Sequence, residues 1–347
     1  MKKKLLQAVK VLVFLSLGLF LVWFAVRGMD VHQILHAFDK VNYGWIILSL
    51  SIGMLSHLSR AMRWKLMLET LGHQPKLNNT FFAVMIGYMA NYAPIPRLGE
   101  ASRCGILKRY EKIPFTESFG TVIAERLIDV LCLMLVFFIT FLVQFDKING
   151  LAHEYVLDPL ARKLGAVQAH PVLAGLILLV CIGGIVLFVK FRKKTGTGII
   201  SKAFAFITGF FDGLKTVKNL KRPGLFVMHT VFIWVVYYVT FHMCLFSLPE
   251  TATVTFREGI SIFALGTLGV VFTPGGLGAY QIIVQNSLLS FLILRFPADQ
   301  AKTISAAFPW VVWSSQFILI VGMGLVSLIL LPLLNKEQHE GAATHTA

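Results

Sequence analysis

The sequence predicts an all-α polytopic membrane protein with about six transmembrane helices and two re-entrant helical hairpins, arranged as an inverted repeat. Hydrophobic residues make up 56% of the 347 residues and charged residues only 14%, against roughly 25% charged in a soluble domain. The mean hydropathy is +0.73. Six segments are long and apolar enough to cross a bilayer, and two further apolar segments are broken by proline and glycine. These features exclude a soluble globular protein, a disordered chain and a nucleic-acid-binding domain.

The charge and the cysteines agree with this class. The formal net charge of +15 indicates basic loops beside anionic lipid headgroups. The four cysteines show no metal-ligand spacing and three lie in apolar runs, so we expect neither a disulfide framework nor a zinc site. The N-terminal run Lys2-Lys3-Lys4 precedes an apolar stretch without a cleavage motif, which favours an uncleaved signal anchor.

Six segments are expected to cross the membrane, because a helix needs about 20 apolar residues to do so. The third is extended from about Phe115 by a stretch that carries charges, and residues 335–347 are expected to form a disordered cytoplasmic tail after a single membrane domain over residues 1–334. The crossings are residues 11–26, 43–59, 130–145, 172–189, 224–248 and 303–334.

Two segments have the wrong length for a crossing. Residues 77–96 are apolar but end in Asn-Tyr-Ala-Pro-Ile-Pro, and residues 259–294 are uncharged with Pro274-Gly275-Gly276-Leu277-Gly278 in the middle. Two half-helices that meet at a break explain both segments. Such irregular backbone is tolerated at membrane depth only where it is buried in protein or lines a cavity.

The distribution of lysine and arginine predicts the membrane topology of these segments. With the N-terminus in the cytoplasm, the cytoplasmic segments carry 23 of the 32 basic residues and the opposite loops carry 8, with Arg126 inside the membrane. This bias requires residues 77–96 to enter and leave from the cytoplasm and residues 259–294 to enter and leave from outside. We therefore expect an inner (cytoplasmic) membrane protein with both termini in the cytoplasm.

The two broken segments enter from opposite sides of the membrane, which indicates an inverted repeat. The pattern Gly87-x10-Leu98-Gly99 recurs as Gly266-x10-Leu277-Gly278, at an offset of 179 residues. The halves would span about residues 5–147 and 171–334. The alternative is that two short glycine and leucine matches arose by chance.

Ionisable residues gather around the first broken segment and the third crossing, where they are costly and usually functional. Glu125 and Asp129 lie four residues apart on one helical face, so they need a cation from elsewhere, which Arg97 or Arg103 could supply. The cluster either pins the hairpin to the bundle or offers its arginines to an anionic headgroup, and the two interpretations are compatible. The candidate headgroup residues here are Arg60, Arg63, Asn91, Arg97, Glu100, Arg103, Glu125, Arg126 and Asp129.

Simpler roles are open for several of these positions. Arg60 and Arg63 are expected at the cytoplasmic boundary, where snorkelling explains them equally well, and Trp64 is expected to be an interfacial anchor. The second break offers backbone N–H groups and the Gln281 amide to an anion, although close backbone packing explains its glycines too. The candidate residues of this break are Pro274, Gly275, Gly276, Gly278 and Gln281.

The chain resembles the lysylphosphatidylglycerol synthase transmembrane region family, the flippase-like domain of the multiple peptide resistance factor proteins. This resemblance implies lipid translocation between leaflets by a bundle built around two re-entrant segments. The aminoacyl-transferring domain of the full-length enzymes is not in this sequence, so lysyl-lipid synthesis is not implied, and Gln281 stands where many relatives carry glutamate. The resemblance rests on Arg60-x-x-Arg63-Trp64, Asn91-x-x-Pro94, Arg97-Leu98-Gly99-Glu100-x-x-Arg103, Glu125-Arg126-x-x-Asp129 and Pro274-Gly275-Gly276-Leu277-Gly278.

The sequence thus predicts a flippase or transporter for an anionic phospholipid or a polyprenyl-phosphate lipid. The alternatives are an integral membrane transferase acting on lipid phosphates, with Glu100 or Asp129 as base, and a non-transporting partner of an envelope enzyme. No catalytic, nucleotide-binding or metal motif is found, so we expect no catalytic residues, no cofactor and no metal. The expected partners are membrane lipids with anionic headgroups and possible envelope-biosynthesis enzymes, and not nucleic acid. The sequence leaves the lipid, the energy coupling and the oligomeric state open.

Overall fold

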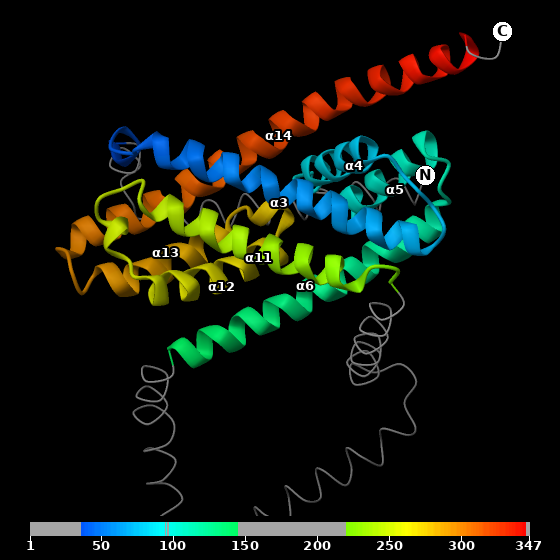
Figure 1. Ribbon diagram of the computed structural model, residues 1–347. Helices are drawn as coiled ribbons and strands as arrows, with labels where there is room; N and C mark the ends of the chain where they lie inside the picture. The colour runs from blue at the N-terminus through cyan, green and yellow to red at the C-terminus, as the bar shows by residue number, and fades with distance from the viewer. Residues whose placement is uncertain (1–35, 94, 96, 145–219, 345–347) are drawn as a thin grey trace, which may run out of the picture. The chain divides into compact units, whose positions relative to one another are not determined.

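The computed structural model describes residues 36–93, 95, 97–144 and 220–344 (Figure 1). The chain divides into two compact units, one of residues 1–136 with 219–347 and one of residues 137–218. Apart from the end of α6, every element below belongs to the first unit.

The described part of the chain is helical. Four of its helices, α3, α6, α11 and α14, are long and apolar enough to cross a membrane, which confirms an all-α polytopic membrane protein. The predicted crossings at 11–26 and 172–189 lie outside the described residues. The elements are α3 (Tyr43–Thr70), α4 (Leu77–Ala90), α5 (Leu98–Tyr110), α6 (Phe115–Val143), α11 (Pro223–Leu245), η2 (Thr251–Thr253), α12 (Phe256–Phe272), η3 (Pro274–Gly276), α13 (Ala279–Leu292) and α14 (Ala298–Thr344).

Helices α3 and α11 pack side by side in opposite directions (Figure 1). The Asn42 backbone N–H donates to the Ser247 carbonyl (2.8 Å), and the Ser49 hydroxyl donates to the Thr240 carbonyl (3.0 Å). Small residues such as Ser49 let two membrane helices approach closely. The start of α3 therefore lies beside the end of α11.

Helix α3 contains the crossing predicted over residues 43–59 and continues beyond it to Thr70. The apolar run stops at Arg60, but the helix does not, because the side chains of Arg60 and Arg63 are buried against carboxylates on α6. A hydropathy boundary marks where the lipid-facing composition changes. It does not mark the helix end when the charges are paired inside the protein.

The segment expected to break near residues 91–97 is a pair of helices, α4 and α5, which pack on each other. Asn91 Oδ1 accepts a hydrogen bond from the Gly99 N–H (3.1 Å). Any Cβ on Gly99 would lie 2.3 Å from the Gly87 carbonyl oxygen, so this crossing requires glycine. The far ends of the two helices are also joined, because Glu111 Oε1 accepts from the Lys76 N–H and from Asn79 Nδ2.

The second broken segment is likewise a helix pair, α12 and α13, interrupted by η3. A capping box formed by Thr255 and Glu258 starts α12. Arg295, just after α13, donates to both Glu258 carboxylate oxygens (2.8 and 2.9 Å) and so joins the two ends. Burial opposes ionisation of Glu258, but the Thr255 N–H and the Arg295 guanidinium hold its pKa below the usual value. The pair therefore remains charged at neutral pH.

Helix α14 packs against α13, α4 and α3. It extends to Thr344, so residues 335–344 are helical where the sequence predicts a disordered tail. Helix α6 buries side chains only over its first part, from Ser118 to Leu133, and passes from the first compact unit into the second after residue 136.

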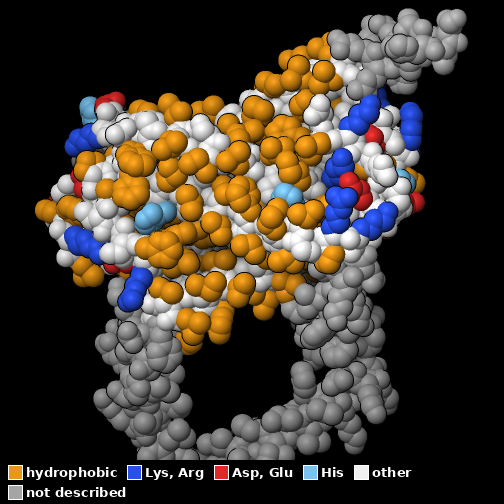
Figure 2. Space-filling model, in the orientation of Figure 1, with side chains coloured by type: hydrophobic (Ala, Val, Ile, Leu, Met, Phe, Trp, Pro, Cys, Tyr) orange, Lys and Arg blue, Asp and Glu red, His pale blue; other side chains and the backbone are white. Residues whose placement is uncertain are grey.

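The visible surface has the polarity expected of a membrane protein. Figure 2 shows orange hydrophobic side chains across the middle of the described region and charged side chains gathered at its two ends. The exposed apolar residues include Ile47 and Leu55 on α3 and Val227, Val231 and Val235 on α11. Apolar side chains at such positions fit contact with lipid tails.

Candidate functional site

The centre of the charged cluster is Glu125 on α6, whose side chain is 1% exposed. Its Oε1 accepts from Arg60 Nη1 (2.8 Å) and Arg63 Nη2 (3.1 Å). Its Oε2 accepts from Arg103 Nη2 (2.9 Å). One buried carboxylate thus pairs with three buried guanidinium groups from α3 and α5.

Asp129 lies one helical turn further along α6 and faces the same arginines. Its Oδ2 accepts from Arg60 Nη1 (2.7 Å) and its Oδ1 from Arg63 Nη2 (2.8 Å). Glu125 and Asp129 therefore share one helical face, as their spacing predicts. All four carboxylate oxygens of the pair are occupied by arginine donors.

Neighbouring side chains hold the three buried arginines in place. The Arg103 guanidinium stacks on the Trp64 ring, with its carbon 4.1 Å from the ring centroid, and Trp64 Nε1 donates to Thr121 Oγ1 (2.9 Å). From α11, Tyr237 accepts from Arg60 (3.2 Å) and Thr230 accepts from Arg63 (3.3 Å). The cluster links α3, α5, α6 and α11.

These contacts correct two sequence-based expectations. Arg60 and Arg63 are 3% and 0% exposed, so they do not snorkel at the membrane boundary. Trp64 is fully buried and is not an interfacial anchor. Arginine and tryptophan both occur commonly at membrane interfaces. Only the carboxylates on α6, a helix later in the chain, show that Arg60, Arg63 and Trp64 point into the protein.

The cluster lies deep within the helices that carry it. Glu125 and Asp129 are about 15 and 21 Å along α6 from Phe115, and Arg60 is about 15 Å from Thr70 at the end of α3, at 1.5 Å per residue. The hydrocarbon core of a bilayer is about 30 Å thick. Three arginines face two carboxylates in the buried set, which leaves it with one excess positive charge.

Arg126 and Glu100 form a separate ion pair beside the buried set. Arg126 Nη2 lies 3.2 Å from Glu100 Oε1, and the two side chains are 40% and 18% exposed. This pair is the accessible edge of the cluster.

Arg97 and Asn91, both predicted headgroup residues, lie outside the ion-pair network. Arg97 is exposed and has a left-handed backbone (φ 61°) where α5 begins, and its side chain does not cap the helix. Asn91 places its carbonyl oxygen on the Gly99 N–H. Of the two arginines predicted to serve the α6 carboxylates, Arg103 does so and Arg97 does not.

The second break does not present an open set of backbone donors. The Gly278 N–H donates to Gln281 Oε1 (2.7 Å), and the Gly276 N–H donates to the Thr273 carbonyl (3.0 Å). Two of the predicted anion donors are therefore used internally. The close-packing alternative describes this break better.

Close packing at the second break brings the two breaks into contact. The Tyr92 ring, from the α4–α5 break, lies so near Gly275 that any Cβ there would be 2.3 Å from Tyr92 Cδ1. Trp313 Nε1 on α14 donates to the Gly275 carbonyl (2.7 Å), and Phe317 packs edge-on to Tyr92 with the ring centroids 5.0 Å apart. These aromatic residues were not predicted from the sequence, although the spacing of Trp313 and Phe317 places both on one face of α14.

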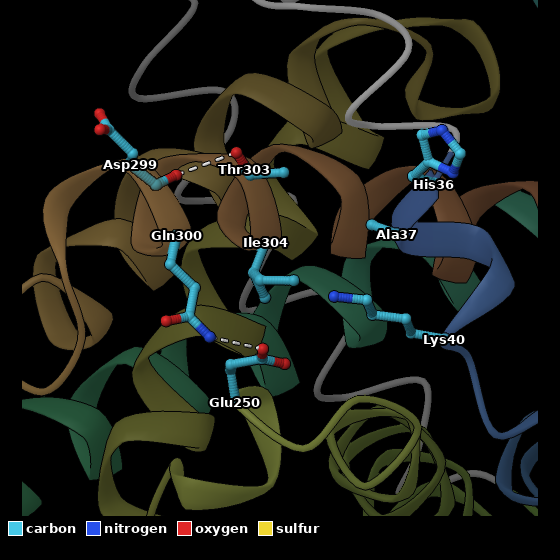
Figure 3. Close-up of a pocket in the computed structure, with 8 residues that line it drawn as sticks. All are labelled: His36, Ala37, Lys40, Glu250, Asp299, Gln300, Thr303 and Ile304. Atoms are coloured by element: carbon cyan, nitrogen blue, oxygen red, sulfur yellow. Dashed lines mark hydrogen bonds between the residues drawn. The ribbon is translucent and has the colours of Figure 1, made fainter.

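A cavity of about 360 Å³ lies away from the charged cluster, between the start of α14 and the segment before α3 (Figure 3). On one side of it, Gln300 Nε2 donates a 2.8 Å hydrogen bond to Glu250 Oε1, and the Lys40 side chain points into it from the other side. The residues that line it are His36, Ala37, Lys40, Glu250, Asp299, Gln300, Thr303 and Ile304. None of them is a predicted headgroup residue.

The fold and the cluster define a helical multi-pass membrane protein with a charged site inside its bundle. A sequence model of the lysylphosphatidylglycerol synthase transmembrane region matches residues 7–322, and the chain belongs to this family.

Two curated relatives are similar over most of the chain. The UPF0104 membrane protein MJ1595 of Methanocaldococcus jannaschii is 24% identical over 311 residues, which cover 85% of this chain and 88% of that protein. The glycosyltransferase AglD of Haloferax volcanii is 22% identical over 309 residues, which cover 80% of this chain but 48% of that protein. No solved structure matches the chain.

Proposed function

We propose that this protein moves an anionic phospholipid or a polyprenyl-phosphate lipid between the two leaflets of a cell membrane. The observation that carries the proposal is a set of three buried arginines and two carboxylates inside an apolar helical bundle, with one positive charge in excess. Buried charges are costly unless paired, so an excess of arginine at this depth favours an anion as the missing partner. Arginine suits phosphate because its planar fork donates two parallel hydrogen bonds.

The two broken helix pairs fit re-entrant hairpins from opposite sides of the membrane. The ends of α4–α5 meet at Glu111, near the end of α3, and the ends of α12–α13 meet through Arg295 and Glu258, near its start. The breaks meet inside, at Tyr92 and Gly275. Alternating access needs one gate on each side, and two hairpins that enter from opposite sides would serve as these gates.

Internal symmetry also supports a transporter, since inverted repeats with broken helices are a recurrent transporter plan. The starts of α11, α12, α13 and α14 follow those of α3, α4, α5 and α6 by 179 to 183 residues (43 and 223, 77 and 256, 98 and 279, 115 and 298). Arg97 and Gly276 are 179 residues apart, both have a positive φ (61° and 77°), and a Leu-Gly pair follows each. The matching backbone conformation at the two breaks supports a repeat that includes them.

In this account the headgroup enters the bundle and the tails do not. The phosphate reaches the cluster from its exposed edge and passes the contact between the two breaks, while the acyl or prenyl chains remain in lipid. A lateral opening between helices is required, because a closed pore would have to admit the tails.

The proposed membrane topology predicts a specific pattern of cysteine labelling. Lys108, at the end of α5, and Asp299, at the start of α14, are both exposed. In a chain whose own cysteines are replaced by serine, we expect an impermeant maleimide added to intact cells to label Asp299→Cys but not Lys108→Cys. Cell lysis should make Lys108→Cys reactive. Labelling of both positions in intact cells would contradict the opposed hairpins and the cytoplasmic termini.

Reconstitution tests the activity itself. Vesicles that contain the purified protein and a trace of fluorescent phosphatidylglycerol are expected to expose the inner-leaflet label to an external quencher within minutes. Empty vesicles, and vesicles with heat-unfolded protein, should keep about half of the label protected. Protection in all three preparations would reject lipid transfer as the activity of the isolated protein.

A transferase acting on a lipid phosphate is the second candidate, because one relative is named a glycosyltransferase. Asp129 has both oxygens occupied by arginines, so Glu100 is the better candidate for a base. Mass spectrometry of the vesicle lipids separates the proposals: a transferase changes lipid mass and a transporter changes only sidedness. A non-transporting partner of an envelope enzyme would do neither.

A further inference from the structure

The four arginines around α6 fall into two groups by exposure. The side chains of Arg60, Arg63 and Arg103 are 4%, 0% and 3% exposed. The side chain of Arg126 is 40% exposed. Arg126 is the member of this group that a molecule from outside the bundle reaches without unpacking the protein.

The buried carboxylates take no hydrogen bond from Arg126. Both oxygens of Glu125 and both oxygens of Asp129 accept hydrogen bonds from the other three arginines. Within the described part of the chain, Arg126 makes one ion pair, through Nη2 to Glu100 Oε1 at 3.2 Å. A guanidinium can donate two parallel bonds to one anion, so this pair uses only part of its capacity.

Glu100 has a second favourable position. It lies in the first turn of α5, and the residue before that helix, Arg97, provides no side-chain cap. The positive end of the helix dipole stabilises a carboxylate at this position. Glu100 can therefore leave Arg126 without being stranded as an unpaired charge.

We propose that Glu100 is an internal competitor of the transported lipid: it occupies Arg126 in the empty protein, and a lipid phosphate displaces it. Arg126 then positions the headgroup through two hydrogen bonds. The whole cluster, with Arg126 and Glu100 included, has four arginines and three carboxylates, and the single negative charge of a phosphodiester balances the one excess positive charge. This inference rests on the proposed function and adds to it how the same site is regulated.

Binding of dioctanoyl phosphatidylglycerol to the purified full-length protein tests the competition. Glu100→Gln keeps the size and polarity of the side chain but removes its charge, so the affinity is expected to rise about tenfold, which corresponds to about 1.4 kcal/mol. Arg126→Gln is expected to lower the affinity at least tenfold. Glu117→Gln, a change on α6 in a separate pair with His73, should bind as the parent does.

Arg126→Lys separates recognition from folding. It keeps the ion pair with Glu100 but loses the two-pronged donor geometry, so it should melt as the parent does and still bind the lipid more weakly. Equal affinities for the parent and Glu100→Gln, or unchanged binding by Arg126→Gln, would overturn the proposal. So would inorganic phosphate or dioctanoyl phosphatidylcholine binding as tightly as the phosphatidylglycerol.

The same variants distinguish this inference from the proposed function. If the parent transfers lipid but Glu100→Gln binds no more tightly, only the competition is wrong. If Glu100→Gln binds more tightly but the parent transfers no lipid, the competition stands and the transport function fails.

Discussion

Replacement of Glu125 by glutamine is expected to destabilise the protein more than any other single change in the cluster. Glutamine removes the charge that faces Arg60, Arg63 and Arg103. Arg103 then loses its carboxylate partner, and Arg60 and Arg63 keep only Asp129. Breaking a buried ion pair by removing one partner costs about 3–5 kcal/mol. The total stability of a typical domain is about 5–15 kcal/mol, so little folded protein should remain at elevated temperature. Thermal melting in detergent measures this loss.

Two companion variants identify the cause. Glu117→Gln neutralises a carboxylate on the same helix that is 45% exposed and paired with His73, and it should cost less than about 1 kcal/mol. Arg103→Met added to Glu125→Gln removes one stranded charge and should recover part of the loss. If Glu125→Gln melts with the parent, the cluster is hydrated and does not hold the helices together.

Gly275→Ala is expected to disrupt the contact between the two breaks. Its backbone has φ +61°, which costs an alanine about 1–2 kcal/mol, and its new Cβ would lie 2.3 Å from Tyr92 Cδ1. The Tyr92 ring must therefore move away from Trp313 and Phe317. We expect a lower melting temperature and an altered rate of lipid transfer, because transfer passes this contact.

A double substitution shows whether the contact or the backbone is responsible. Tyr92→Ala makes room for the new methyl group, so the double variant should regain the steric part of the loss and keep the cost of the positive φ. Gly120→Ala on α6, where nothing lies within 4 Å of the added Cβ, is the matched control and should be neutral or slightly stabilising. Losses at Gly275 and Tyr92 that simply add would show that the two residues are not in contact.

The sequence was sufficient for the positions of the described crossings and for the break points, but not for the ends of α3 and α14. Length and apolar composition located the described crossings, and the Pro-Gly-Gly run at residues 274–276 located the second break, because few residues other than glycine adopt a positive φ there. The four-residue spacing of Glu125 and Asp129 correctly placed both on one face. These are local properties, determined by residues close together in the chain.

Long-range pairing could not be predicted in the same way. Arg97 and Arg103 both follow the first break, and the sequence does not tell which one faces α6. The left-handed backbone at Arg97 turns that residue outward, and the helix that begins at Leu98 carries Arg103 inward. The contact between Tyr92 and Gly275 joins residues 183 positions apart, and neither carries a charge that would indicate a partner.

Arg60 and Arg63 illustrate the same limit. Two arginines after an apolar run fit both a membrane boundary and a buried site. Their burial follows from Glu125 and Asp129, which lie more than 60 residues later. An acidic pair inside a later crossing was the available signal, and it indicated that some arginine must face it without naming which one.

The rate at which fluorescent phosphatidylglycerol changes leaflet is the most direct test of the central assignment, a lipid transporter that recognises phosphate at the α6 cluster. It should be measured in matched vesicles that contain the parent, Arg126→Gln or Glu117→Gln. The account predicts transfer by the parent and by Glu117→Gln, and transfer at least tenfold slower by Arg126→Gln, which loses the accessible guanidinium. Equal rates in all three preparations, or a parent rate no greater than that of empty vesicles, would contradict it.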